Sequence, residues 1–189
     1  MGKILCYIYN EMADFEISLL LHRLNKAGEK EIISISEDLE PKLAQSGLTY
    51  IPDKEISSIT NFEDIEGLII PGGPINNKQN DICPLITKIV TEEKLVAAIC
   101  FAPQFLGRAG ILNSYKYTTS CSSEKILDLK CDDPFNWNNY VDCRSVVDRN
   151  VVTAKGYAFV DFAIEVCEYF NIYENEKQKF EQLYIIKEK

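Results

Sequence analysis

The sequence predicts an α/β fold in which a doubly wound, mostly parallel sheet is flanked by helices. Short, uniformly apolar runs alternate along the chain with longer segments whose apolar residues recur at helical spacing. Runs of this kind are typical of parallel strands that are buried on both faces. The connections between the segments are short, as in folds that wind back and forth across a sheet. Ligands of such folds bind at the carboxyl ends of the strands, so the residues that follow each strand are the candidates for function.

The N-terminal elements are predicted to form a β-α-β unit. A strand over residues 3–9 passes through a polar turn into a helix over residues 14–27. Asp14 is a candidate N-cap for this helix, and Gly28 is the residue at which we expect it to stop. A second strand over residues 31–36 completes the unit.

The next part of the chain predicts a third strand with a glycine turn at its end. Residues 37–66 carry prolines and a glycine among short apolar pieces, which favours a small hairpin and a connecting turn or helix. The strand over residues 67–70 ends in Pro71-Gly-Gly-Pro74. Two adjacent glycines let backbone N–H groups approach a ligand closely, although glycines also form ordinary tight turns.

A cysteine stands at the point where the most apolar run gives way to a helix. Residues 95–99 are apolar throughout and predict a central strand. Residues 102–109 have a helical pattern, with Pro103 in the first turn and Gly110 at the stop. Cys100 therefore lies on a strand-to-helix turn, the nucleophile elbow that presents a reactive side chain at the carboxyl edge of a sheet. The positive end of a helix favours thiolate over thiol at such a position.

The second half of the chain continues the alternation. Valine pairs around a polar turn predict a hairpin over residues 146–152, and residues 132–139 carry the only tryptophan and predict an irregular loop. No linker or repeat divides the chain, so we expect residues 1–189 to form a single domain. The remaining predicted elements are helices over residues 81–93, 122–130, 157–170 and 174–183 and a strand over residues 115–120.

Composition and charge exclude several classes of function. Charged residues make up 26% of the 189 residues, and the formal net charge is −9. Nucleic acids and anionic membranes bind clustered lysine and arginine side chains, so neither is an expected partner. No segment approaches the ~18 apolar residues of a membrane span, and the apolar run near the first residue is too short for a secretion signal. We therefore expect a cytoplasmic protein.

The cysteines predict free thiols in a reducing compartment. There are 7 of them, scattered along the chain and without a C-x-x-C pair or a neighbouring histidine. Neither a disulfide framework nor a metal site has this pattern, and no cofactor motif is present. Cys6 and Cys167 stand among apolar residues and are expected to be buried as small hydrophobic side chains.

Four sequence blocks resemble the DJ-1/PfpI (ThiJ) family, a branch of the class I glutamine amidotransferase-like superfamily. They span nearly the whole chain and occur in the family's order. The resemblance implies a flavodoxin-like fold with the nucleophile elbow at Cys100, and it implies a homodimer. The blocks are Asp14-Phe-Glu-Ile-Ser18, Gly67-Leu-Ile-Ile-Pro-Gly-Gly73, Ala98-Ile-Cys-Phe-Ala-Pro103 and Val151-Val-Thr-Ala-Lys-Gly156.

The resemblance also implies roles for residues around Cys100. In the family a glutamate at the start of the first helix reaches the elbow cysteine, and Glu16 occupies that place. A protonated Glu16 can donate a hydrogen bond to the sulfur and stabilise a thiolate, whereas an ionised one repels it. We therefore expect Glu16 to have a raised pKa, and we expect its loss to raise the pKa of Cys100. The backbone N–H groups of Gly73 and Phe101 match the family's oxyanion-binding pocket.

The chain departs from the family's pattern because it has no histidine beside the cysteine. Hydrolytic relatives carry histidine directly after the nucleophile, where this sequence has Phe101, and others carry it on the next strand, where this sequence has Ser120. The only histidine, His22, lies in the middle of the first helix, where packing or a subunit interface is its expected role. Cys121 is either a resolving thiol for Cys100 or an unrelated buried thiol.

Two functions fit these residues. The first is an oxidation-sensitive stress-response protein, in which Cys100 forms a sulfenic or sulfinic acid that Glu16 and nearby N–H groups hold. The alternative is a cysteine-dependent enzyme on small carbonyl substrates, of a glyoxalase, deglycase or hydratase type, with Glu16 as acid and base. Protease and amidotransferase activities are disfavoured because the histidine base is missing. A third reading is a noncatalytic binding protein; in each case the partner is a small molecule.

Overall fold

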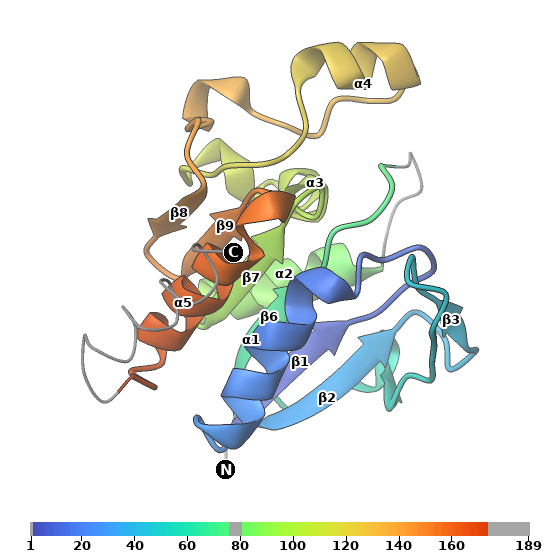
Figure 1. Ribbon diagram of the computed structural model, residues 1–189, viewed down its shortest axis with the longest axis vertical. Helices are drawn as coiled ribbons and strands as arrows, with labels where there is room; N and C mark the ends of the chain where they lie inside the picture. Colours follow the sequence, from blue (N-terminus) through green and yellow to red (C-terminus); the bar gives the residue numbers. More distant parts are fainter. Residues whose placement is uncertain (1, 76–80, 174–189) are drawn as a thin grey trace, which may run out of the picture.

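A seven-stranded sheet forms the centre of the computed structural model, which describes residues 2–75 and 81–173 (Figure 1). The strand order is β5-β2-β1-β6-β7-β9-β8, and every neighbouring pair is parallel except β8 and β9. The predicted doubly wound, mostly parallel sheet is therefore confirmed. The strands are β1 (Lys3–Tyr7), β2 (Glu31–Ser36), β5 (Lys54–Glu55), β6 (Ile65–Ile70), β7 (Leu95–Ile99), β8 (Ser145–Asp148) and β9 (Val151–Ala154).

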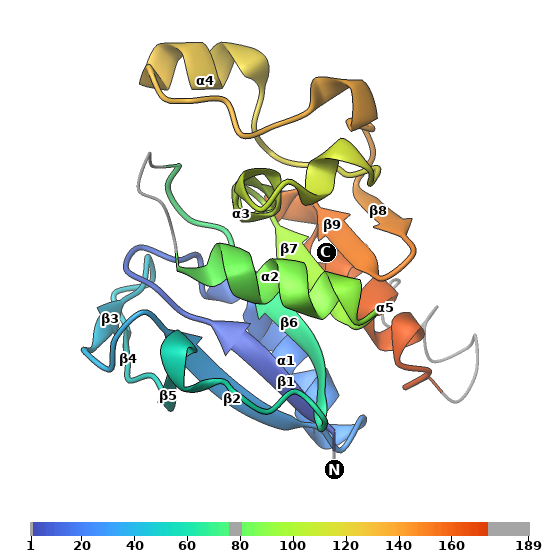
Figure 2. The ribbon, with the colours of Figure 1, turned by 180° about the vertical axis from the view of Figure 1, so that it is seen from behind.

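Helices cover both faces of the sheet. On one face α1 (Phe15–Lys26) packs against α5 (Phe159–Tyr169), and on the other α2 (Ile82–Thr91) packs against α3 (Pro103–Arg108) (Figures 1 and 2). All five residues of β7 are buried, which agrees with the uniformly apolar sequence of this central strand. The sandwich brings the start of α1 to the carboxyl edge of the sheet, where β7 ends.

A small hairpin folds over the start of α1. It consists of β3 (Lys42–Leu43) and β4 (Thr49–Tyr50), and it confirms the hairpin predicted between residues 37 and 66. The prediction that Asp14 caps α1 is wrong, because its side chain accepts no hydrogen bond from the helix. The Asp14 carboxylate instead accepts hydrogen bonds from the hydroxyls of Ser46 (2.5 Å) and Tyr50 (2.9 Å). It therefore ties the hairpin to the helix.

The strand predicted over residues 115–120 does not form. The β-pairing described for this segment is one isolated bridge, between Tyr117 and Tyr140. The β8–β9 hairpin explains the difference, since β9 lies between β7 and β8 and offers no vacant edge. The segment crosses the end of the sheet instead, where the Thr118 N–H donates to the Thr153 hydroxyl at 2.9 Å.

The remaining elements follow the sequence closely. The helix expected at residues 122–130 is α4 (Ser123–Leu129), and the Ser122 hydroxyl caps it by accepting from the Lys125 N–H. Figure 1 shows α4 at the outer end of the molecule, away from the sheet. A single 3₁₀ turn interrupts the loop over residues 132–139. The helix expected at residues 174–183 lies outside the described residues. None of the described helices is long and apolar enough to cross a bilayer.

Candidate functional site

Cys100 occupies a strained turn directly after β7. Its φ is +63°, in the left-handed region that a residue with a side chain rarely adopts. Both of its backbone groups are held: its N–H donates to the Ala154 carbonyl at 2.8 Å, and its carbonyl accepts from the Thr119 hydroxyl at 2.7 Å and the Ser120 N–H at 2.9 Å. Strain of this kind persists only where the surrounding structure over-determines it. Neighbouring segments thus fix the direction in which the Cys100 side chain projects.

Glu16 meets the cysteine from the first turn of α1. Its side chain is buried, and its carboxylate is hydrogen bonded to the Cys100 thiol. Its Oε2 also accepts the Gly72 N–H at 2.8 Å, while the Gly72 carbonyl accepts from the Ala13 N–H at 2.7 Å. These bonds fix the start of α1 against the glycine turn that follows β6. The pairing implied by the family resemblance is thus present in the geometry.

Two glycines enclose the Glu16–Cys100 pair. A Cβ atom on Gly72 would lie 2.4 Å from Glu16 Oε2 and 2.6 Å from Cys100 Cβ. A Cβ atom on Gly156 would lie 2.7 Å from Glu16 Oε1 and 2.9 Å from the Cys100 sulfur. Both positions require glycine because no side chain fits. The sequence predicts close backbone approach at Gly72, as one of two adjacent glycines, but offers no such signal at Gly156, which ends the fourth sequence block.

The Ser120 side chain and the Phe101 backbone are hydrogen bonded to the Cys100 sulfur. Both interactions lower the pKa of Cys100, as hydrogen-bond donors to a thiolate do. The Ser120 hydroxyl also accepts the Gly156 N–H at 2.9 Å, which holds it in place. Ser120 therefore provides a donor at the position where some relatives have histidine, but it cannot act as a base of comparable strength.

The pKa values of Cys100 and Glu16 differ from those that the N-terminal end of a helix alone would produce. Burial, then the charge of Glu16 and its hydrogen bond, raise the pKa of Cys100 to about 12. Burial also raises the pKa of Glu16, against the lowering effect of the bonds to Cys100 and Gly72. The expected raised pKa of Glu16 is present, whereas the expected lowered pKa of the thiol is not, because burial and the carboxylate outweigh the short helix α3. The two acids therefore titrate as a coupled pair, and a thiolate forms without a change of net charge when a proton moves from Cys100 to Glu16.

A cavity of about 550 Å³ opens in front of the pair. Apolar side chains of α1, the β3–β4 hairpin and the cysteine turn supply much of its wall. Gly73 lines it as well, and a Cβ there would lie 2.5 Å from the Tyr9 hydroxyl. The lining residues are Glu11, Ala13, Phe15, Glu16, Leu43, Ala44, Gln45, Gly73, Pro74, Cys100 and Phe101.

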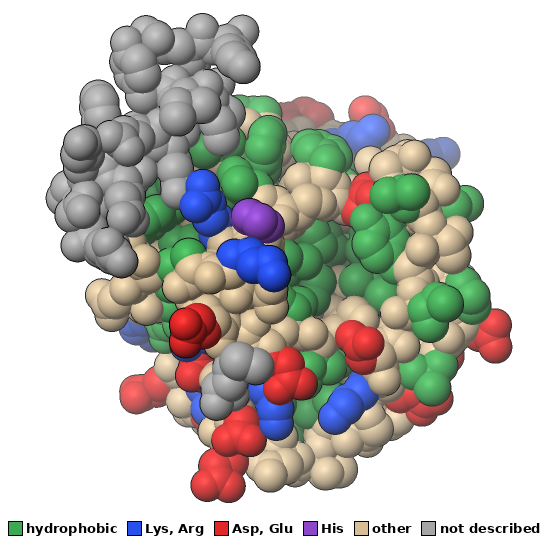
Figure 3. Space-filling model, turned by 60° about the horizontal axis from the view of Figure 1, so that its bottom comes forward, with side chains coloured by type: hydrophobic (Ala, Val, Ile, Leu, Met, Phe, Trp, Pro, Cys, Tyr) green, Lys and Arg blue, Asp and Glu red, His purple; other side chains and the backbone are tan. Residues whose placement is uncertain are grey.

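Two other candidates from the sequence stand apart from this cavity. Cys121 is buried, and its thiol donates to the Ser122 carbonyl at 3.5 Å. Burial raises the pKa of Cys121 to about 11, and its further charge neighbours include Asp133 and Cys131. Cys121 and Cys100 are both free thiols, with no disulfide between them. His22 is exposed on α1, where Figure 3 shows the histidine beside basic side chains.

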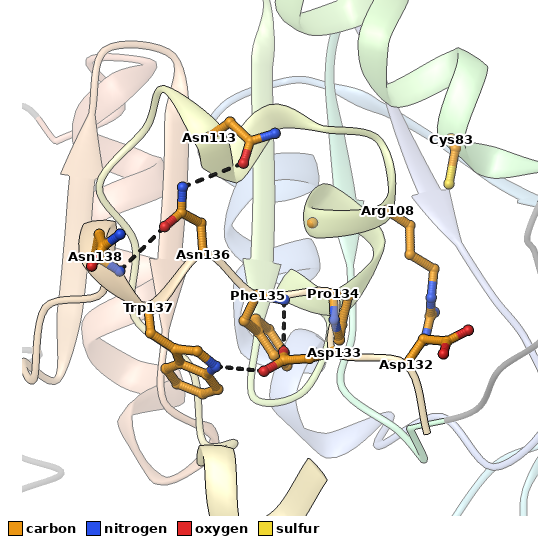
Figure 4. A pocket seen from close by; sticks show the side chains of 11 residues that line it. Cys83, Arg108, Asn113, Asp132, Asp133, Pro134, Phe135, Asn136, Trp137 and Asn138 are labelled. Carbon is orange, nitrogen blue, oxygen red and sulfur yellow. Dashed lines mark hydrogen bonds between the residues drawn. The ribbon is translucent and has the colours of Figure 1, made fainter. Parts of the chain in front are cut away.

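A larger cavity, of about 830 Å³, lies between α3 and the loop over residues 132–138 (Figure 4). Much of its polar lining is bonded internally: Asn136 donates to Asn113 at 3.3 Å, and the Trp137 indole donates to Asp133 at 2.7 Å. Neither Cys100 nor Glu16 lines it. Within residues 2–75 and 81–173, no group of three or more histidine, cysteine or carboxylate side chains is placed to hold a metal ion.

Fold and site together define a class: α/β proteins that hold a cysteine–glutamate pair at the carboxyl edge of a parallel sheet. The family model of the DJ-1/PfpI family matches residues 2–169, and this chain belongs to that family.

Similar proteins carry several different names. An uncharacterized protease YoaZ of Bacillus subtilis is 29% identical over 90% of this chain and 84% of its own length. The deglycase PH1704 of Pyrococcus horikoshii is 31% identical over 81% of this chain and 89% of its own. The solved structure of the DJ-1 superfamily protein Atu0886 from Agrobacterium tumefaciens is 27% identical, with a TM-score of 0.85 over 100% of both chains.

Proposed function

We propose that this chain is an oxidation-sensitive stress-response protein of the DJ-1 type, whose reactive group is Cys100 at a nucleophile elbow. The observation that carries the proposal is the enclosed pair of Cys100 and Glu16, with Ser120 and the Phe101 N–H directed at the sulfur. A buried thiol with no function needs neither a strained backbone nor a carboxylate partner.

The oxidation step follows from the shared proton. When the proton moves to Glu16, the Cys100 thiolate attacks one oxygen of a peroxide, an S–O bond forms and the O–O bond breaks. The leaving hydroxide takes up a proton and departs as water. A second peroxide molecule converts the sulfenate to a sulfinate in the same way. The new oxygens can accept hydrogen bonds from Glu16, from Ser120 and from the N–H group of Phe101.

A deglycase-like or glyoxalase-like enzyme is the second candidate. It is favoured by the deglycase among the relatives and by the cavity that faces Cys100. The Cys100 thiolate would add to a carbonyl carbon, and the Glu16 proton would pass to the carbonyl oxygen, giving a neutral hemithioacetal. The N–H groups of Gly73 and Phe101 would stabilise the developing oxyanion. Protease chemistry has less support, because Phe101 and Ser120 stand where relatives have histidine.

Graded peroxide treatment followed by peptide mass mapping tests the first candidate. Cys100 is expected to gain one or two oxygens before Cys143, which is exposed and serves as the internal comparison. Oxidation of Cys143 first would contradict the proposal. Turnover of methylglyoxal that disappears in Cys100→Ser but persists in Cys143→Ser would favour the enzyme instead.

We also propose that the protein is a cytoplasmic homodimer that meets small molecules rather than nucleic acid or membrane. Two large apolar side chains that are exposed on or beside the β3–β4 hairpin and do not line the cavity support the homodimer, Leu48 at 61% and Ile51 at 71%. Light scattering coupled to size exclusion should give twice the chain mass. Ile51→Glu, a charge placed on this surface outside the cavity, should shift the mass toward that of one chain.

A further inference from the structure

Among the residues that the structure describes, those lining the cavity in front of Cys100 carry charge of one sign only. Its described lining includes two carboxylates, Glu11 and Glu16, and no lysine, arginine or histidine. Two lysines adjoin the site in sequence, but their charges are matched elsewhere. Lys42, which precedes Leu43, forms a salt bridge with Asp38, and Lys155, which precedes Gly156, forms one with Asp142.

Glu11 is held at this cavity by its backbone. Its φ is +63°, a conformation that glycine or asparagine adopts more readily than glutamate. Its N–H donates to the Leu43 carbonyl at 2.7 Å, and its own carbonyl accepts from the Gln45 side chain at 3.0 Å. The turn before α1 and the β3–β4 hairpin thus hold a carboxylate at the cavity in spite of an unfavourable backbone conformation.

The two carboxylates differ in what they can do. Glu16 is buried and hydrogen bonded to Cys100, whereas Glu11 is exposed at the surface of the chain. Glu11 therefore supplies the charge that an approaching molecule meets at the cavity wall. A charge at the wall of a cleft repels ions of like sign and leaves neutral molecules unaffected.

We propose that Glu11 is a specificity-determining residue, and that it makes the Cys100 cavity select neutral or cationic electrophiles against anionic ones. The inference rests on the proposed reactivity of Cys100 and names the substrate class for it. Uncharged peroxides and uncharged or amine-bearing carbonyl compounds enter, whereas carbonyl compounds that carry a carboxylate or phosphate are repelled. The apolar side chains of Phe15, Leu43 and Phe101 suit a small hydrocarbon substituent on the accepted molecule.

Alkylation with two matched reagents tests this selection without assuming an enzymatic activity. Iodoacetamide and iodoacetate are similar in size, but only iodoacetate is anionic. In both reactions the Cys100 sulfur displaces iodide, an S–C bond forms as the C–I bond breaks, and the thiol proton passes to Glu16 or solvent. The rate at Cys100 is read by peptide mapping, and the ratio of the two rates is divided by the same ratio for free N-acetylcysteine.

Three variants give the expected pattern. Glu11→Gln should raise the relative rate of iodoacetate about threefold at low ionic strength, and Glu11→Lys should raise it about tenfold. Both effects should shrink in about 0.5 M salt, because salt screens exposed charges. Glu29→Gln is the matched control, since Glu29 is also exposed with a positive φ of 50° but follows the opposite end of α1. It should leave the ratio unchanged.

The outcomes separate the inference from the function on which it rests. An unchanged ratio in both Glu11 variants, or an equal rise in Glu29→Gln, would overturn the charge selection while leaving Cys100 a reactive thiol. Failure of Cys100 to react with either reagent in the native protein would contradict the proposed function, and the selection with it.

Discussion

The buried carboxylate of Glu16 is hydrogen bonded to the thiol of Cys100 and at the same time accepts the Gly72 N–H at 2.8 Å. Burial raises the pKa of both members of the pair. Two acids that both resist ionisation and share one site titrate as a unit, so the location of a single proton controls the sulfur.

The sharing of a proton between Glu16 and Cys100 predicts how the alkylation rate of Cys100 depends on pH. Moving a proton between Glu16 and Cys100 changes no net charge, so the thiolate fraction of the singly protonated pair does not depend on pH. The alkylation rate of the native protein should therefore be nearly flat over the pH range in which the pair holds one proton, above the raised pKa of Glu16. In Glu16→Gln the thiol must lose its proton to solvent, and the rate should rise about tenfold for each pH unit. A flat profile in Glu16→Gln, measured with iodoacetamide, would contradict the shared proton.

Gly156→Ala adds only a methyl group, but it should lower both the stability of the protein and the reactivity of Cys100. The added Cβ would lie 2.7 Å from Glu16 Oε1 and 2.9 Å from the Cys100 sulfur, so one of the two side chains must move. We expect a loss of about 1–3 kcal/mol in the free energy of unfolding and about a tenfold slower alkylation of Cys100. Urea unfolding and peptide mapping measure the two effects.

Gly110→Ala provides the comparison for that variant. Gly110 has a φ of +77°, and the nearest atom to a Cβ there would be 4.0 Å away. It should lose about 1 kcal/mol through backbone strain while the alkylation rate of Cys100 stays the same. Equal slowing in both variants would show that lost stability, rather than lost space, is the cause.

Ser120→Ala should weaken the thiolate without unfolding its surroundings. The change removes a donor to the sulfur and the acceptor of the Gly156 N–H, so the apparent pKa of the Cys100 thiol should rise. We expect alkylation at neutral pH to slow about fivefold. Ser122→Ala, which removes the cap of α4, should instead cost about 1 kcal/mol of stability with no change at Cys100. An unchanged alkylation rate in Ser120→Ala, with a slower rate in Ser122→Ala, would exclude a role for Ser120 at the sulfur.

Asp14→Asn should make the stability of the protein less dependent on acid pH. Burial raises the pKa of Asp14, but hydrogen bonds from Ser46 and Tyr50 outweigh it and leave the pKa below its usual value. A lowered pKa contributes stability that is present above about pH 4 and is lost as the pH falls further. The variant should therefore be less stable by about 2 kcal/mol at neutral pH, and the difference should narrow below about pH 4. Thermal unfolding across this pH range measures the stability of both proteins. A difference in stability that stays constant with pH would contradict the role of the Asp14 carboxylate.

Local sequence pattern determined most of the fold. The apolar run over residues 95–99 predicted β7 because a strand covered on both faces must be apolar throughout. Residues 115–120 have a strand-like pattern too, but pattern cannot show whether a sheet has a vacant edge. The β8–β9 hairpin, rather than residues 115–120, extends the sheet beyond β7. The Asp14 carboxylate likewise bonds to hairpin residues that lie 32 and 36 positions further along the chain.

The sequence by itself, with the family resemblance it carries, predicted the candidate site residues: Cys100 on its turn, Glu16 at the start of a helix, and Phe101 and Ser120 in place of histidine. Only the tertiary structure decided how they act together. It enclosed the pair between Gly72 and Gly156, and it raised the pKa of both acids by burial. These properties depend on distances between segments far apart in the chain, and burial is a property of the assembled fold rather than of any one segment.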